Sequence, residues 1–277
     1  MSALAPGSGP PGPFWMDWDL DPAIATPLVL AASMYAAGVV RLWWRAGRGH
    51  GVNGGQLTLF SAGWLILAAA LVSPLHALAE RLFAAHMVEH ELLMAVAPPL
   101  LVLAAPFPAY LWSLPRLIRQ QFAVLGRLVS PAWRMLTVPI VATVIHGVAI
   151  WVWHIPLFFA AALASEWVHW LQHASFLLTG VVFWSAMFGQ RESGYGRAVG
   201  HLFATSMHTG LLGALLVLAP RPWFPAAGGF GLSPLEDQQL GGLIMWVPGC
   251  MIYAGAALVL VGKWIIASGD RQPLIRA

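Results

Sequence analysis

Residues 83–112 read FAAHMVEHELLMAVAPPLLVLAAPFPAYLW, a mostly apolar run that opens with a pair of histidines. A helix rises about 1.5 Å per residue, so about 20 apolar residues cross the hydrocarbon core of a bilayer. This stretch is therefore a candidate transmembrane helix, but it is too long for one straight crossing. Pro98 and Pro99 lack backbone N–H groups, so we expect them to kink the helix.

Six further apolar runs have the length of single membrane crossings. They cover residues 24–44, 57–79, 136–155, 168–188, 198–219 and 239–266. The predicted fold class is all-α, a polytopic membrane bundle of seven transmembrane helices that occupies residues 23–268. A count of six would result if the first run were only interfacial, but the edge formed by Arg41 and Arg45 argues against it. The stretch Leu157–Ser165, after Pro156, predicts a short interfacial helix.

The composition excludes the common classes of soluble protein. Hydrophobic residues make up 59% of the 277 residues and charged residues 9%, and the mean hydropathy is +0.73. A soluble chain has roughly 45–50% apolar and about 25% charged residues. The single cysteine, Cys250, excludes an internal disulfide, and the scattered basic residues predict no nucleic-acid partner. The P-loop, G-x-S-x-G and H-E-x-x-H motifs are absent, so we do not expect an enzyme.

The basic residues predict how the chain is oriented in the membrane. With seven spans, twelve of the 14 Lys and Arg residues fall on one side: Arg41, Arg45, Arg48, Arg116, Arg119, Arg127, Arg134, Arg191, Arg197, Lys263, Arg271 and Arg276. The positive-inside rule makes this side cytoplasmic, which places the N-terminus outside. Residues 269–277 are then a cytoplasmic tail. Residues 1–22 form a Pro/Gly-rich extracytoplasmic tail without the basic start or apolar core of a signal peptide.

Histidine is the main chemical signal. Six of the 10 histidines fall at the outer ends of four predicted spans: His76, His86, His90, His154, His169 and His173. Within the pairs His86/His90 and His169/His173 the residues are four apart, so each pair shares one helix face. Two such pairs facing each other offer four imidazoles for a metal ion, with His76 and His154 as helpers.

Sulfur and carboxylate groups lie near these histidines in the sequence. Met87 and Met94 are predicted soft ligands, because imidazole with thioether suits copper better than magnesium or calcium. Glu80, Glu89 and Glu166 are predicted to orient the rings as hydrogen-bond acceptors. The simpler alternative is that each histidine is an amphipathic interfacial residue and each methionine packs in the core. The six histidines come from four predicted helices and lie at the same depth, and this agreement favours a metal site over incidental positions.

Two deeper histidines, His146 and His208, leave other functions open. They could form a midplane relay of a copper transporter together with Met207 and Cys250. They could be the axial ligands of a b-type haem in a redox protein. They could also simply join helices by hydrogen bonds. An assembly scaffold without any metal is the remaining alternative to transient copper binding at the outer face.

Several blocks of sequence between residues 73 and 249 resemble, in their order and spacing, the seven-helix CtaG-type cytochrome c oxidase assembly factors. The blocks are His86–His90 with Ala97–Leu101, Trp153–Pro156, Val168–His173 followed by Phe183 and Trp184, and Asp237–Gly242 with Met245–Gly249. The resemblance implies a bacterial plasma-membrane protein needed to build active haem–copper oxidase by supplying copper. Its implied partners are oxidase subunits and extracytoplasmic copper donors. The N-terminal tail lies outside the resemblance.

Overall fold

The computed structural model describes residues 18–190, 194–224 and 230–269, and this part of the chain is helical without a strand. Its helices are α1 (Pro22–Ala46), α2 (Gly54–Val72), α3 (Pro74–Ala79), α4 (Phe83–Glu91), α5 (Ala97–Ala104), α6 (Phe107–Ser113), α7 (Arg116–Leu136), α8 (Pro139–Trp153), α9 (Pro156–Ala164), α10 (Glu166–Phe188), α11 (Tyr195–Leu218), α12 (Pro234–Ile244) and α13 (Cys250–Gly269). Two π-helical turns join neighbours, η2 (Leu92–Val96) between α4 and α5 and η4 (Met245–Gly249) between α12 and α13. The predicted all-α class is confirmed, and α9 is the short helix expected after Pro156.

Six helical segments of the described chain are long and apolar enough to cross a membrane: α1, α2, α4–α5, α10, α11 and α12–α13. A seventh follows if α7 and α8, which meet at 77°, are counted as one bent span. The chain is therefore a multi-pass membrane protein with six or seven spans. Most of the predicted tails, residues 1–17 and 270–277, lie outside the described residues.

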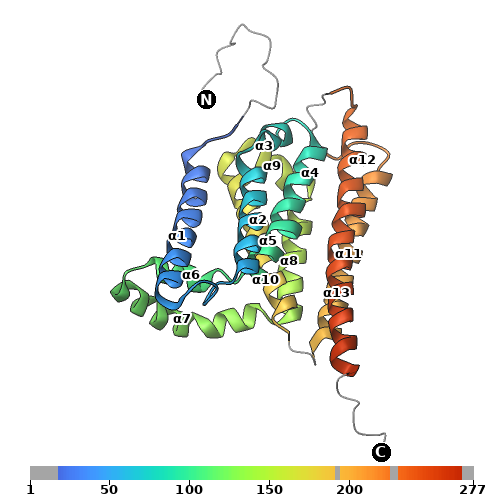
Figure 1. Ribbon diagram of the computed structural model, residues 1–277. Helices are drawn as coiled ribbons and strands as arrows, with labels where there is room; N and C mark the ends of the chain where they lie inside the picture. Colours follow the sequence, from blue (N-terminus) through green and yellow to red (C-terminus); the bar gives the residue numbers. More distant parts are fainter. Residues whose placement is uncertain (1–17, 191–193, 225–229, 270–277) are drawn as a thin grey trace, which may run out of the picture.

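The bundle has two distinct ends (Figure 1). Helices α3 and α9 lie at one end, which we call the α3–α9 end, and α6 and α7 lie at the other, the α7 end. Helix α1 begins at the α3–α9 end, and α13 finishes at the α7 end. The chain just before α1 is tied to the end of α2, because the Asp19 N–H donates to the Val72 carbonyl at 3.2 Å.

Two predicted spans prove longer than the helices that form. The run 57–79 divides at Ser73, whose extended backbone ends α2 and whose hydroxyl accepts a hydrogen bond from the Leu75 N–H as α3 begins. The run 83–112 stops at Ala104, because Ala105 adopts the left-handed conformation with φ 45°. Pro106 follows and has no N–H with which to continue the helix.

The proline pair in the third span produces a π-helical turn, and Phe83–Ala104 remains one span. Pro98 has no N–H for the carbonyl of Met94, four residues earlier. Trp184 on α10 satisfies that carbonyl instead, with its Nε1 donating at 3.0 Å. Gly180 makes room for this approach, since a Cβ there would lie 3.0 Å from the same oxygen. The prolines thus help to attach α4–α5 to α10.

The arginine-rich stretch between the third and fourth predicted spans forms the helix α7. Figure 1 shows α7 lying across the end of the bundle, nearly at right angles to the spanning helices. Apolar side chains such as Leu117 and Leu128 are 76% and 73% exposed along it, with arginines interleaved. A basic amphipathic helix in this position is typical of a segment that lies in the membrane surface.

The main chains of α11 and α12 touch at Gly213 and Gly242. A Cβ on Gly213 would lie 2.6 Å from the Gly242 carbonyl oxygen, closer than real Cβ contacts allow. Small residues let transmembrane helices approach this closely and gain dispersion energy along their length. This contact sets the distance between α11 and the helix that carries Asp237.

Gly213→Ala is expected to lower the free energy of unfolding by about 1–3 kcal/mol, because the added methyl forces α11 and α12 apart. Denaturant unfolding of the full chain in detergent measures the loss. Gly255→Ala on α13 is the matched control, since nothing lies within 4 Å of its Cβ position. The control is expected to be neutral or slightly stabilising, because alanine is the better helix former. Equal stability of Gly213→Ala and the unmodified chain would contradict the contact.

Candidate functional site: a buried histidine cluster

The N-terminus of α4 is capped by a side chain from far along the sequence. Leu82 stands at the N-cap position and offers no side-chain acceptor. Asp237, fully buried on α12, accepts instead from the Phe83 N–H at 2.7 Å and the Ala84 N–H at 2.9 Å. Helix starts need acceptors for their free N–H groups, and a carboxylate there also complements the helix dipole. Asp237 therefore holds the turn that carries His86.

Six histidines from four structural elements form one buried cluster at the α3–α9 end: His76 on α3, His86 and His90 on α4, His154 at the end of α8, and His169 and His173 on α10. We call this set the histidine cluster. The ring centroids within each i, i+4 pair are 4.2 Å apart. Across the helices, His86 and His169 are 5.5 Å apart and His90 and His173 are 5.7 Å apart. The structure thus brings the six predicted histidines together.

The remaining two histidines complete the ring of contacts. The His76 ring stacks on His169 with centroids 5.5 Å apart. The His154 ring lies 6.0 Å from His90, and its Nδ1 donates to the Ile150 carbonyl at 2.6 Å. That hydrogen bond leaves Nε2 as the free lone pair of His154.

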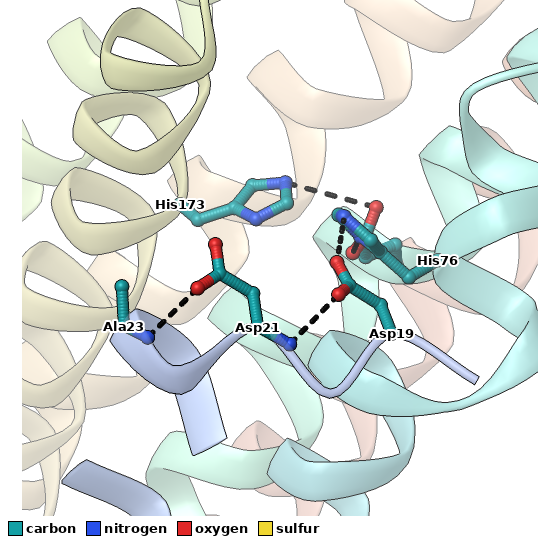
Figure 2. A network of polar contacts seen from close by, with 6 residues as sticks. Asp19, Asp21, Ala23, His76 and His173 are labelled. Carbon is teal, nitrogen blue, oxygen red and sulfur yellow. Dashed lines mark hydrogen bonds and ion pairs between the residues drawn. The ribbon is translucent and has the colours of Figure 1, made fainter. Parts of the chain in front are cut away.

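Glu89 lies inside the cluster and is fully buried. Its Oε1 is 2.7 Å from His76 Nδ1, and its Oε2 is 3.7 Å from His173 Nε2. From the other side, Asp19 Oδ2 approaches His76 Nε2 at 3.6 Å. Figure 2 shows how Asp19 and Asp21, in the chain that leads into α1, reach towards His76 and His173. His76 is therefore held between two carboxylates.

Neighbouring carboxylates set the direction in which the pKa of His76 is shifted. Burial lowers the pKa of His76, but the hydrogen bond and charge of Glu89, with the charges of Glu80 and Asp19, outweigh it. The pKa of this ring is therefore raised above its ordinary value.

Several ring nitrogens of the cluster are buried without a hydrogen bond of ordinary geometry: both of His86, both of His90, and Nε2 of His154, His169 and His173. Buried polar atoms nearly always have partners, so this many ring nitrogens without a hydrogen bond in one place fits a cation better than a packed core. Ligand atoms of His86, Glu89 and His169 all lie within 4.8 Å of one another. Bonds of about 2 Å place the ligands of one ion within about 4 Å of each other, so small rotamer changes would complete a site.

A family model described as cytochrome c oxidase caa3 assembly factor, Caa3_CtaG, matches residues 33–267, which include the whole histidine cluster. The chain belongs to this family. It is also 24% identical, over 95% of its length, to an uncharacterized protein of Mycobacterium leprae, ML1998. The chain spans about 41% of the length of that relative. No solved structure shows a significant match.

The other predicted site residues of this Caa3_CtaG family member lie around the cluster in different ways. Glu80 is exposed but close enough for its charge to act on His76, whereas Glu166 is exposed at the start of α10. Met87 packs towards α12, where a Cβ on Gly241 would lie 3.0 Å from its Cγ. Met94 follows His90 by one turn and is fully buried against α10. Their roles as soft ligands or orienting groups stay predictions.

The deeper histidines lie apart from the cluster. His146 has both ring nitrogens engaged, with Thr179 Oγ1 at 3.1 Å and Tyr253 OH at 3.2 Å. His208 Nδ1 accepts from Trp151 Nε1 at 3.3 Å, while its Nε2 has no partner. The interhelical hydrogen bonds that sequence alone left as one alternative are thus present at both positions.

Two carboxylates of the site were not singled out from the sequence. Asp237 appeared only as part of a motif, although the missing cap at Leu82 was a usable signal that a remote acceptor must exist. Asp19 lies in a stretch that looked like an irregular tail. Nothing in its local pattern connects it with His76, because the two residues are 57 positions apart.

Proposed function

We propose that this Caa3_CtaG family member captures copper at the histidine cluster and passes it to a haem–copper oxidase during assembly. The observation that carries the proposal is the burial of six histidines around Glu89 with several unpaired ring nitrogens. Neutral imidazole is a favoured ligand for copper, and a carboxylate offsets the charge of the ion in a low-dielectric site. Six imidazoles exceed the number one ion needs, so ligands can exchange as copper enters and leaves.

The distribution of charge supports a seven-span topology with the cluster on the extracytoplasmic side of a bacterial plasma membrane. Helix α8 rises beside α10 between the two ends of the bundle (Figure 1), and we count it as the seventh span. Nine of the 11 described Lys and Arg residues lie on elements at the α7 end, and only Arg81 and Arg221 lie at the other. The positive-inside rule then assigns the α7 end to the cytoplasm and the cluster to the outside. Oxidase subunits and extracytoplasmic copper donors are the partners this location allows.

The geometry gives less support to the haem and transporter alternatives. A haem needs a flat slot as wide as its macrocycle between the two axial histidines, whereas rings of the cluster pack directly against one another and against Phe159 and Phe176. His146 would have to give up the Thr179 and Tyr253 hydrogen bonds before it could bind a metal. A transporter would need a continuous relay through these same groups.

Metal analysis of the purified full chain tests the proposal. After incubation with Cu(I) and gel filtration, we expect the protein to retain about one copper ion per chain. The double variant His169→Ala/His173→Ala is expected to retain little, because one of the two facing pairs is gone. The proposal would be rejected if the unmodified chain retained no copper, or if the double variant retained as much copper as the unmodified chain.

Glu89→Gln is expected to weaken copper binding by about 10–100-fold, as loss of a carboxylate that orients metal-bound histidines does elsewhere. Competition against a chelator of known affinity measures the change. Glu166→Gln is the matched control, because this carboxylate is exposed at the start of α10, and its affinity is expected to be unchanged. Equal effects of the two substitutions would mean that Glu89 acts only through overall charge.

A further inference from the structure

A second polar site lies at the opposite end of the molecule from the histidine cluster. A cavity of about 450 Å³ opens between the end of α1, the end of α6 and the start of α7. Four arginines line it, Arg41 and Arg45 from α1 and Arg116 and Arg119 from α7, together with Trp112 from α6. Four cations around one cavity repel each other, so an anion bound among them would be favoured.

The guanidinium groups are positioned by specific contacts. Arg41 donates from Nη1 to the backbone carbonyls of Trp112 and Ser113, at the end of α6. Arg119 lies over the Trp112 ring with its Cζ 4.2 Å from the centroid, and Arg45 lies 5.9 Å from the same ring. Cation–π contact and backbone acceptors therefore arrange three of the four side chains around a single indole.

No carboxylate neutralises these arginines within the described ranges 18–190, 194–224 and 230–269. The ion pairs seen between described residues include none of the four cavity arginines. Helix α7 begins beside the cavity without a side-chain cap, so the positive end of its dipole adds to the field. The fork of a guanidinium matches the oxygen geometry of a phosphate group.

An apolar groove borders the cavity. Its presence favours a lipid over a free anion as the ligand of the four arginines. It lies between α6 and α7, and its walls include Leu111, Phe122, Val129 and Trp133. Arg119 of the cavity and Phe122 of the groove are neighbours one turn apart on α7. Since α7 is a basic amphipathic helix that lies across the end of the bundle, as a helix in the membrane surface does, the charged cavity and the groove match the headgroup and the acyl chain of one lipid.

We propose that this site binds an anionic phospholipid, with its phosphate among Arg41, Arg45, Arg116 and Arg119 and an acyl chain along the α6–α7 groove. The lipid neutralises the arginines and fastens α7 to the ends of α1 and α6. The proposal is independent of copper binding, because the site is at the other end of the bundle.

Native mass spectrometry of the full chain in mild detergent tests it, with dioleoyl phosphatidylglycerol as the probe. We expect the unmodified protein to retain this lipid in preference to dioleoyl phosphatidylcholine. Arg116→Gln/Arg119→Gln is expected to weaken retention about fivefold for each guanidinium removed, or roughly 25-fold in total. Arg45 is exposed at the rim of the cavity, on α1. The single variant Arg45→Gln therefore leaves α7 unchanged, and it is expected to weaken lipid retention about fivefold.

The double variant Arg134→Gln/Lys263→Gln removes the same charge at the same end of the bundle but outside the cavity. It is expected to retain phosphatidylglycerol as the unmodified chain does. Equal losses in the cavity and control variants would overturn the proposal in favour of general surface charge. Equal retention of phosphatidylcholine, or displacement of the lipid by inorganic phosphate at the same concentration, would also overturn it, the latter in favour of a free-anion site.

Discussion

Cells in which the protein carries His86→Ala and His90→Ala together are expected to assemble an oxidase that lacks copper. The two rings stand at the centre of the histidine cluster, with His86 facing His169 and His90 between His173 and His154. Loss of even an orienting partner costs metal sites about 10–100-fold in affinity, so loss of two ligands is expected to cost more than about 100-fold. Copper content of the isolated oxidase measures the effect.

The matched control removes two histidines elsewhere. His50 lies in the loop between α1 and α2, and His201 lies near the start of α11, so both are at the α7 end. His50→Ala/His201→Ala is expected to leave oxidase copper normal while changing the histidine count equally. The amount of each variant in the membrane fraction has to match that of the unmodified protein. A normal copper content of the oxidase in cells with the His86/His90 variant would show that copper delivery does not need the histidine cluster.

Asp237→Ala is expected to lower the free energy of unfolding by about 2–4 kcal/mol, one of the largest effects of any single change in this chain. It leaves the Phe83 and Ala84 N–H groups buried without an acceptor at the start of α4. The first turn of α4 is then expected to fray, which moves His86 and weakens copper binding as well. Denaturant unfolding in detergent and the chelator competition measure the two consequences.

Two variants separate capping from a general effect of charge. Asp237→Asn keeps one acceptor oxygen, so it is expected to retain about half of the stabilisation. Glu236→Gln changes the neighbouring exposed acid, which lies in a capping box with Ser233 where glutamine is also tolerated. It is expected to leave stability and copper binding unchanged. An Asp237→Ala protein as stable as Glu236→Gln would show that α4 does not depend on this cap.

The crossings themselves were predictable because a bilayer imposes its own length scale on the sequence. Each membrane-spanning segment falls on a predicted apolar run, and the predicted ends that differ most from the helix ends are those near Ser73 and Ala105. Both errors come from local backbone geometry inside a continuous apolar run, which hydropathy does not register. Helix α7 was missed for the opposite reason, since its arginines lower the mean hydropathy although its apolar residues follow a helical period.

The candidate site was predictable in part. The i, i+4 spacing places His86 with His90 and His169 with His173 on single helix faces, and this follows from helix geometry alone. The choice among carboxylates was not predictable in this way. Glu89 is central and Glu166 exposed, although both stand three or fewer positions from a histidine of a pair.

The order of residues along the chain was therefore sufficient to establish a helical membrane protein with histidines gathered at one depth. Apolar length and helical periodicity are short-range properties, and the bilayer turns them directly into structure. Packing of helices distant in sequence supplied the rest: the convergence of α3, α4, α8 and α10, the Asp237 cap 154 residues from Phe83, and the arginine cavity between α1 and α7. Such contacts depend on which helix faces meet, and complementary shape and hydrogen bonding between the helices select those faces.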